Sequence, residues 1–224
     1  MAAALLLVGA FALSNPAAAA AATVADWRMN ERSGAATMND SGPSNLDGSI
    51  GSAVLTGVVT NGATGYRWTA QNKDGYRPER LVIVRSSLLN PGTASYAVTL
   101  RMYTGAGDQN IIQKGQAHTR GGMWKIDMVQ GHVICMYKGS QGQGAVRSAQ
   151  TLWDNTWHVV RCERRPTGVT LRVDNGTPRT NAGATGTIAN SWELAIGGKS
   201  RCDPPAVQCD YYVGRLDYVR VERF

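Results

Sequence analysis

The stretch Thr151–Thr177, TLWDNTWHVVRCERRPTGVTLRVDNGT, decides the fold. Trp157–Arg164 forms one apolar-centred run, and a turn containing Pro and Gly separates it from Val169–Asp174. Apolar and polar residues alternate in this second run, which is typical of a half-buried strand. Asn175-Gly176 then ends the strand, because both residue types adopt positive φ at little cost. The stretch therefore predicts a β-hairpin.

Similar short runs follow one another along most of the chain, separated by Gly-rich and polar turns. Together with the hairpin, these expected strands lie at residues 24–29, 54–59, 65–68, 81–84, 95–103, 110–114, 122–129, 132–138, 191–196, 210–213 and 214–221. No segment shows sustained helical periodicity. Many short strands with regular turns predict an all-β protein, an antiparallel two-sheet β-sandwich or jelly roll.

The first 22 residues do not belong to this pattern. Ala2–Leu13 is an apolar run that is followed by a short polar segment and a stretch of alanines. Small residues between positions 19 and 22 suit signal-peptide cleavage, although no Lys or Arg precedes the apolar run. The alternative is a membrane anchor, which needs roughly 20 apolar residues to span a bilayer. The apolar run is much shorter, so we predict a signal peptide at 1–22 and one secreted domain at 23–224.

Four cysteines follow the predicted signal peptide, and an even count in a secreted chain indicates disulfides. Three pairings are possible, and we favour Cys135 with Cys162 and Cys202 with Cys209. The first two lie in consecutive strand-like runs, where a cross-strand bridge fits. A zinc site is the competing interpretation, but the C-x-x-C spacing that such sites use is missing.

The formal net charge is +7, and most of the positive charge is on arginines scattered along the chain. One interpretation is a solvated basic surface that keeps the protein soluble. The other is attraction to anionic polymers, such as acidic glycans or nucleic acid. The densest cluster, Arg161, Arg164 and Arg165, lacks the interleaved aromatic residues of single-strand binders. We favour the solvated surface and expect no nucleic-acid partner.

Several motifs occur in an order that carries a family resemblance. They are WRMNERSG at 27–34, DSG at 40–42, YAVTL at 96–100, IIQKG at 111–115, GMWKI at 122–126, WHVV at 157–160, LRVDNG at 171–176 and GRLDYVRV at 214–221. In this order the chain resembles the laminin G-like jelly-roll domain of the concanavalin A-like lectin/glucanase superfamily. The resemblance implies two curved antiparallel sheets packed face to face, with both termini in one sheet. It also implies that His158 is a packing residue.

The resemblance brings an enzyme question, because glucanases of this superfamily carry an E-x-D-x-x-E strand. Alternation would place those carboxylates on one face, as retaining hydrolysis requires. This chain has no such triplet, no G-x-S-x-G motif and no H-E-x-x-H motif. The three histidines are far apart in the sequence. We therefore predict that the protein is not an enzyme.

Calcium is the cofactor that the resemblance suggests, because related domains often bind Ca²⁺ with oxygens from loops at the sheet edge. Asp40 and Asp217 match positions that carry ligands in some relatives. Calcium needs 6–8 oxygens at about 2.4 Å, so backbone carbonyls around Asn45–Gly48 would have to contribute. The alternative is that Asp40 makes an Asx-turn and that Asp217 makes a cross-strand polar contact.

The loop between Cys202 and Cys209 is a second candidate binding region. Asp203 and Asp210 flank it, and Tyr211 follows with a ring that could stack on a sugar. A bridge and two prolines would hold such a loop in one conformation. The alternative, which we favour, is a disulfide staple that orders a long loop and leaves one tyrosine in the core.

These observations predict a secreted, non-catalytic binding module whose ligand is a carbohydrate, by analogy of fold. One alternative is an adhesion or structural module that binds a cell-surface or extracellular protein. A less favoured one is a glycoside hydrolase whose site is assembled from distant strands. We expect a monomer without a membrane span in the mature chain.

Overall fold

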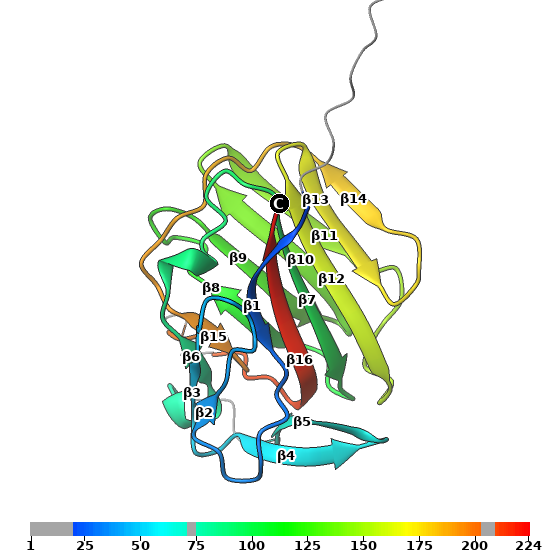
Figure 1. Cartoon of the computed structure of the whole chain (residues 1–224). Coiled ribbons are helices and arrows are strands. Elements are labelled where there is room, and N and C mark those ends of the chain that lie inside the picture. The colour runs from blue at the N-terminus through cyan, green and yellow to red at the C-terminus, as the bar shows by residue number, and fades with distance from the viewer. Residues whose placement is uncertain (1–19, 71–74, 203–208) are drawn as a thin grey trace, which may run out of the picture.

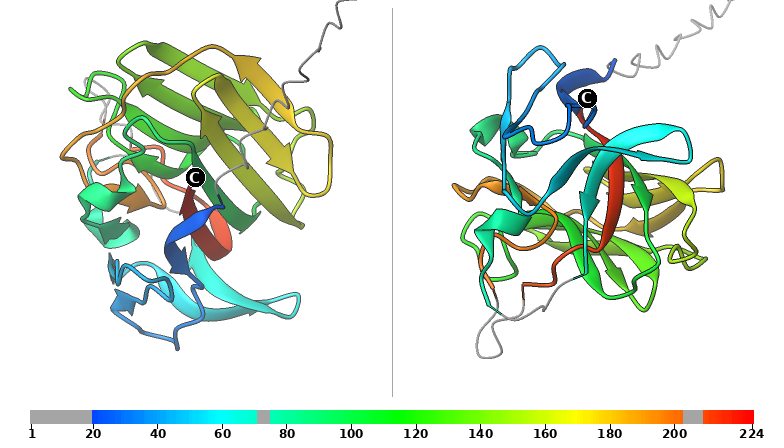
Figure 2. Two further views of the ribbon diagram at one scale, coloured as in Figure 1. Left: turned by 45° about the horizontal axis from the view of Figure 1, so that its top comes forward. Right: turned by 90° about the horizontal axis from the view of Figure 1, so that it is seen from below.

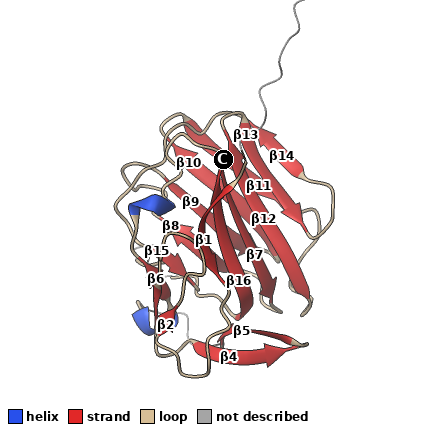
Figure 3. Ribbon diagram, in the orientation of Figure 1, coloured by secondary structure: helices blue, strands red, loops and turns tan. Residues whose placement is uncertain are grey.

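The computed structural model describes residues 20–70, 75–202 and 209–224. Within these residues the protein is built from two antiparallel sheets of eight strands each, packed face to face (Figures 1 and 3). In the described part of the chain, helical structure is confined to two short 3-10 turns, η1 (Pro78–Arg80) and η2 (Ser87–Leu89). The predicted all-β sandwich is confirmed. No helix among the described residues is long and apolar enough to cross a membrane.

One sheet faces the viewer in Figure 1 and is called the front sheet here. Its strands follow the spatial order β14 (Arg179–Ala182), β13 (Gly168–Val173), β12 (Trp157–Arg165), β7 (Tyr96–Tyr103), β16 (Gly214–Arg223), β5 (Ala63–Trp68) and β4 (Leu55–Thr60). The first strand, β1 (Ala22–Trp27), pairs with β16, so the first and last strands lie side by side (Figure 2). This confirms that both ends of the domain pair in one sheet.

The other sheet, called the back sheet here, covers the inner face of the front sheet. Its strands follow the order β11 (Gly142–Arg147), β10 (His132–Gly139), β9 (Met123–Val129), β8 (Gln109–Lys114), β15 (Leu194–Ile196), β6 (Val82–Val84), β3 (Gly48–Ile50) and β2 (Thr37–Met38). Consecutive hairpins build β8 to β11. The remaining strands of this sheet come from segments far apart in the sequence.

The predicted hairpin is the pair β12 and β13. Its register runs from Arg165 opposite Gly168 to Val160 opposite Val173. Alternation along β12 separates the basic cluster that the sequence suggested. Arg161 and Arg165 face outward, whereas Arg164 points inward, is 2 % exposed and donates to the carbonyl oxygen of Ala94. The arginine cluster is therefore not one surface patch.

The core fills the space between the sheets with apolar and aromatic side chains. Its largest buried rings are those of Trp27, Trp68, Trp124, Tyr66, Tyr96, Tyr137 and Tyr212. The buried Tyr211 ring packs in a separate small cluster with Leu81 and Cys209. The Cys135–Cys162 disulfide joins β10 to β12 across this core, with Cα atoms 5.5 Å apart. On the chain-entropy model, its loop stabilises the fold by about 3.5 kcal/mol. Cys202 and Cys209 form the second bridge, so both predicted pairings are confirmed.

Two of the strands that the sequence did not predict, β14 and β11, have few apolar side chains to indicate a strand. All four residues of β14 are exposed, and β11 begins with Gly142-Gln143-Gly144. Conversely, the expected strand at 210–213 is not formed, because Asp210 has φ of 45° and the next two tyrosines are both buried. Neighbouring strands and packing, rather than local pattern, decide these segments.

Candidate functional site

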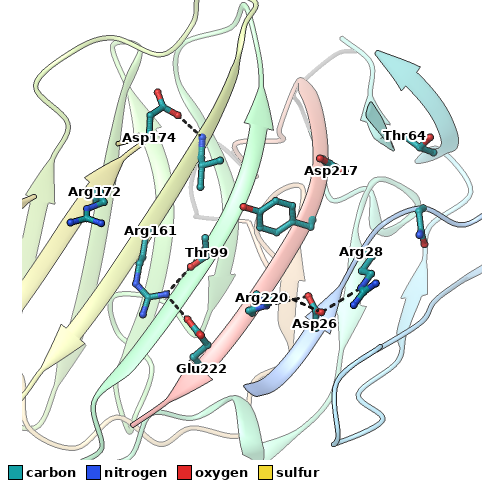
Figure 4. Close-up of a pocket in the computed structure, with 13 residues that line it drawn as sticks. Asp26, Arg28, Thr64, Thr99, Arg161, Arg172, Asp174, Asp217, Arg220 and Glu222 are labelled. Carbon is teal, nitrogen blue, oxygen red and sulfur yellow. Dashed lines mark hydrogen bonds and ion pairs between the residues drawn. The ribbon is translucent and has the colours of Figure 1, made fainter. Parts of the chain in front are cut away.

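The outer face of the front sheet carries a groove of about 660 Å³ (Figure 4). Its lining residues come from β13, β12, β7, β16, β1 and β5, together with short segments that follow β13 and β1. Strand alternation explains why polar side chains are here: on β7, Val98, Leu100 and Met102 are buried, whereas Thr99 and Arg101 are partly exposed. The inner face of each strand builds the core, and its outer face builds the groove.

One cross-strand line of residues, which we call the arginine row, forms the centre of the groove. Successive partners on β13, β12, β7, β16 and β1 are Arg172, Arg161, Thr99, Arg220 and Asp26. All five line the groove. Since neighbouring strands lie about 4.8 Å apart, the row extends across roughly 19 Å of the sheet.

Ion pairs hold most of the charged side chains of the groove in place. Arg161 bonds to Glu222, and a guanidinium nitrogen of Arg220 lies 3.3 Å from the Asp26 carboxylate. Arg28 approaches the same Asp26 oxygen at 3.5 Å, as Figure 4 shows. Pairs at exposed positions stabilise a fold by only about 0–1 kcal/mol each, but they fix the direction of the donors and acceptors. The charged side chains of the groove therefore hold one another in defined directions.

A β-bulge brings an aromatic ring into the groove. The register between β16 and β7 shifts between Leu216 and Tyr218, so Asp217 is the extra residue. Asp217 and Tyr218 both line the groove, and Asp217 accepts from Arg101 at 2.7 Å. Partial burial, and then the negative charge of Asp217, raise the pKa of the Tyr218 hydroxyl. Tyr218 is thus a partly exposed residue whose hydroxyl group stays neutral.

A stack of rings and arginines lies further along the same face. The rings of Trp157 and Tyr103 meet edge to face at 5.5 Å, and the Arg101 guanidinium lies 4.8 Å from the Trp157 ring. The Trp157 indole nitrogen also donates to the Thr60 carbonyl oxygen at 3.1 Å. That bond ties the end of β4 to the sheet. Trp157 is therefore a partly buried support and not an open platform.

His158 lies beside the groove and bridges two carboxylates. Its Nδ1 is 2.8 Å from Asp174, which lines the groove, and its Nε2 is 3.1 Å from Asp154. Burial alone lowers the pKa of His158, but the hydrogen bonds and charges of Asp174 and Asp154 outweigh it and raise the pKa above its ordinary value. The resemblance implied a packing residue, and the imidazole is indeed only 13 % exposed. It also holds Asp174 in position.

The structure places the two predicted calcium ligands in separate roles. The Asp40 carboxylate accepts hydrogen bonds from the backbone N–H groups of Asp26, Gly42 and Leu46, each at 2.8 Å. Asp217 is paired with Arg101. These contacts match the alternative of an Asx-type turn and a cross-strand contact. The described residues contain no group of three or more His, Cys, Asp or Glu side chains that could hold a metal ion.

Two of the predicted ligand residues near the second disulfide, Asp210 and Tyr211, are also held by the fold. Asp203 lies outside the described residues, and Asp210 pairs with Lys199. Tyr211 is 1 % exposed, and its hydroxyl lies 3.3 Å from the Gly75 carbonyl oxygen. The Tyr211 ring thus presents no face to solvent. Tyr211 packs in a small buried cluster with Leu81 and Cys209, and the next residue, Tyr212, lies in the core between the sheets. This arrangement matches the alternative of one tyrosine in the core.

Comparison with known proteins identifies the fold. Among solved structures, domain 4 of AbnA, a GH43 extracellular arabinanase from Geobacillus stearothermophilus, superimposes with a TM-score of 0.56 at 13 % identity, over 91 % of this chain and 93 % of that one. A botulinum neurotoxin type C structure gives 0.56 at 10 % identity, over 90 % and 46 % of the chains. Domains LG4-5 of mouse laminin alpha1 give 0.48 at 16 % identity, over 70 % and 46 %.

The chain spans about half the length of the laminin and neurotoxin chains or less. No curated protein sequence matches it. The family model of the Laminin G domain, in contrast, matches residues 100–223, which is more than half of the chain. This match agrees with the two antiparallel sheets and with the pairing of the first and last strands. The chain therefore belongs to the Laminin G domain family.

Proposed function

We propose that this Laminin G domain protein is a secreted, non-catalytic module that binds a carbohydrate in the groove of the front sheet. The observation that carries the proposal is the groove itself, about 660 Å³ of ordered space with donors, acceptors and one ring. Ligand sites in proteins commonly have volumes of about 300–1,000 Å³ and a few well-placed polar groups. Family membership supports a binding role in general.

The chemistry of the lining suits a sugar. Hydroxyl groups both donate and accept, and the groove offers guanidinium donors on Arg161 and Arg220 beside carboxylate acceptors on Asp26 and Glu222. Ion pairs already hold these groups, so less conformational entropy is lost on binding. The Tyr218 ring supplies an apolar face of the kind on which a sugar ring stacks.

The ligands of two structurally similar proteins are consistent with a carbohydrate ligand. Domain 4 of AbnA was solved in complex with arabinotriose, and it aligns over nearly its whole length. The type C neurotoxin structure concerns cell entry through two ganglioside molecules. At 13 % and 10 % identity both show the shared fold, and the ligand of this chain has to be found by experiment.

The test is a glycan array followed by calorimetry on the glycans that bind. We expect Tyr218→Ala to weaken binding about tenfold, which corresponds to about 1.4 kcal/mol. Tyr76→Ala is the matched control, because Tyr76 is 52 % exposed and lies outside the groove. Failure of every glycan to bind, or equal losses in the two variants, would contradict the proposal.

Two further measurements use the same proteins and glycans. Calcium stays a prediction, and titration in the presence of a chelator tests it. Loss of binding in the chelator would support a calcium site, and binding that survives would contradict a role for calcium in sugar binding. An assay for new reducing ends on the bound polysaccharides tests the hydrolase alternative, and turnover would replace the binding proposal.

A protein partner is the second candidate, and one feature of β4 favours it. β4 is the last strand at one edge of the front sheet, where Val59 is 68 % and Leu55 is 44 % exposed. A free edge with apolar side chains can accept a strand from another chain. Screening an array of extracellular proteins with the wild type and Val59→Lys tests this. Binding that Val59→Lys abolishes, with glycan binding intact, supports the protein partner.

A further inference from the structure

We propose that the exposed ring of Trp153 is a second carbohydrate-binding site, and that it takes an uncharged sugar ring. Trp153 lies in the segment before β12, is 46 % exposed and does not line the groove. The site extends the proposed carbohydrate function to a separate surface. A separate variant can therefore test each surface.

Two glycines lie against the Trp153 ring. A Cβ atom added to Gly131 would lie 2.6, 2.8 and 2.9 Å from the indole atoms Cδ2, Cε2 and Cγ, and one added to Gly107 would lie 2.6 Å from Cζ3. The first three atoms belong to the five-membered ring, so Gly131 lies over a face of the indole and not at its edge. Backbone thus covers one face, and the exposed area of Trp153 belongs to the opposite face and the edges of the ring.

The neighbouring residues hold this ring in one orientation. Leu152 is buried, and its N–H donates to the Gly131 carbonyl oxygen at 2.7 Å. Gly131 has φ of 75° in the turn between β9 and β10, a conformation that favours glycine. A ring that is fixed before binding loses little conformational entropy when a ligand packs on it.

Trp153 differs from other partly exposed tryptophans in what covers it. Arginine guanidinium groups lie over the ring of Trp157 at 4.8 Å and over the ring of Trp192 at 4.3 Å. No arginine or lysine in the described part of the chain stacks on Trp153. Its outer face is therefore open, and no cation at the ring selects for a charged ligand.

Polar groups lie beside the ring, on the residues next to the two glycines. Asp108 accepts a hydrogen bond from the backbone N–H of Gln130, and Arg147 donates to the side-chain oxygen of Gln130 at 3.3 Å. The side-chain nitrogen of Gln130 and the indole nitrogen of Trp153 make no hydrogen bond to any described residue. The site thus offers two N–H donors and a carboxylate acceptor beside an apolar ring.

A sugar ring matches these features, because it combines an apolar C–H face with hydroxyl groups at its edge. A tryptophan at this exposure offers roughly 100 Å² of surface, whereas a stable protein interface needs about 800 Å² from each partner. Among the described residues of segments 104–108, 129–131 and 151–156, Val129 is the only other exposed large apolar side chain. The surface therefore suits one sugar ring better than a protein partner.

The experiment titrates three uncharged hexasaccharides, cellohexaose, xylohexaose and arabinohexaose, by calorimetry. The proteins are the wild type, Trp153→Ala, Trp153→Phe and the control Tyr76→Ala, which changes an aromatic residue of similar exposure. We expect at least one hexasaccharide to bind, and Trp153→Ala to lower its affinity about tenfold. Trp153→Phe keeps a flat ring and should lose less, and Tyr76→Ala should leave the affinity unchanged.

Two further measurements separate sugar binding from packing. The bound sugar should shift tryptophan emission to shorter wavelength, and Trp153→Phe should lose this shift. Gly107→Ala keeps the ring but places a Cβ atom where the ring lies, so it should also weaken binding. If Trp153 only packs against the glycines, Trp153→Ala lowers the free energy of unfolding in urea and leaves the affinity unchanged, which overturns the inference.

Tyr218→Ala distinguishes failure of this inference from failure of the proposed groove site. Hexasaccharide binding in Tyr218→Ala that still requires Trp153 supports the second site. Binding that depends on Tyr218 and not on Trp153 overturns the inference and leaves the proposed function standing. If the wild type binds none of the three hexasaccharides, the inference fails, while the glycan array decides the proposed function.

Discussion

Two regions of the molecule combine aromatic and charged residues: the segment after Cys209 and the groove of the front sheet. The first region buries its aromatic rings, and the second leaves its ring partly exposed. In the segment after Cys209, Tyr211 and Tyr212 are buried and Asp210 is paired with Lys199. On the front sheet, Tyr218 is partly exposed beside rows of charged side chains. The first region has a contiguous motif without an accessible surface. The second has an accessible surface without a contiguous motif, because strand pairing assembles it.

Arginine side chains also have different roles in the two regions. The Arg80 guanidinium lies 5.1 Å from the Tyr211 ring and donates to the carbonyl oxygen of Thr69 at 2.9 Å, so its charge is used inside the fold. In the groove, the charges of Arg172 and Arg220 face solvent. Arginine thus stabilises the structure in one region and is available to a ligand in the other.

Tyr211→Ala should show the largest difference between the two regions, because it should lower stability and leave glycan affinity unchanged. Truncation of a buried aromatic ring removes packing and leaves a cavity, so we expect a loss of about 3–4 kcal/mol in the free energy of unfolding. Glycan affinity should be unchanged at temperatures where the variant is folded. Denaturant unfolding and calorimetry measure the two quantities. Tyr211→Phe, which keeps the ring, is the control and should lose much less stability.

The opposite result for Tyr211→Ala would point to a different binding site. If Tyr211→Ala remains as stable as wild type and loses glycan binding, the ring is a binding platform. The less favoured interpretation of this segment, a binding region, would then apply, and the groove would not be the site.

A smaller effect is expected from replacing both Cys202 and Cys209 by Ser. The bridge closes a short loop, so the chain-entropy model gives about 2.5 kcal/mol, less than for Cys135–Cys162. Urea unfolding of both double variants measures the difference. We expect the Cys202/Cys209 variant to bind glycans as the wild type does. Lost binding with only slight destabilisation would show that this loop contacts the ligand.

Much of the fold could be predicted because its cause is local. Alternating residues at 157–164 and 169–174 specify one buried face, and β12 and β13 form there with the expected turn. The family resemblance implied that both termini pair in one sheet, and β1 and β16 do so. β14 has no apolar face, and no local signal distinguishes it from a loop.

The groove could not be predicted because its neighbours are remote in sequence. Asp26 and Arg220 are 194 residues apart, yet they are cross-strand partners. Arg161 and Arg172 were visible as outward positions of a hairpin, but their common groove with β16 and β1 depends on strand order. Asp40 shows the converse. The family resemblance suggested Asp40 as a calcium ligand, while its carboxylate accepts hydrogen bonds from three backbone N–H groups.

The smallest expected effect concerns His158, which connects the fold to the groove. Asp174 and Asp154 favour its protonated form, so its pKa in the folded protein is raised above the ordinary value of about 6.5. A raised pKa means that the stabilisation is fully present below pH of about 6.5. It is lost as the pH rises through the folded-state pKa. The contribution of His158 to the free energy of unfolding should therefore decrease as the pH rises.

We therefore expect His158→Gln to be less stable than wild type by about 1 kcal/mol near pH 6, with a smaller difference at pH 8.5. His118→Gln is the control, because His118 is exposed and contacts no carboxylate among the described residues. Urea unfolding at the two pH values gives the difference. Glycan affinity should decline over the same pH window, since Asp174 lines the groove and His158 positions it. A pH dependence of stability without one of affinity would show that Asp174 does not contribute to binding, and would confine the site to the arginine row and Tyr218.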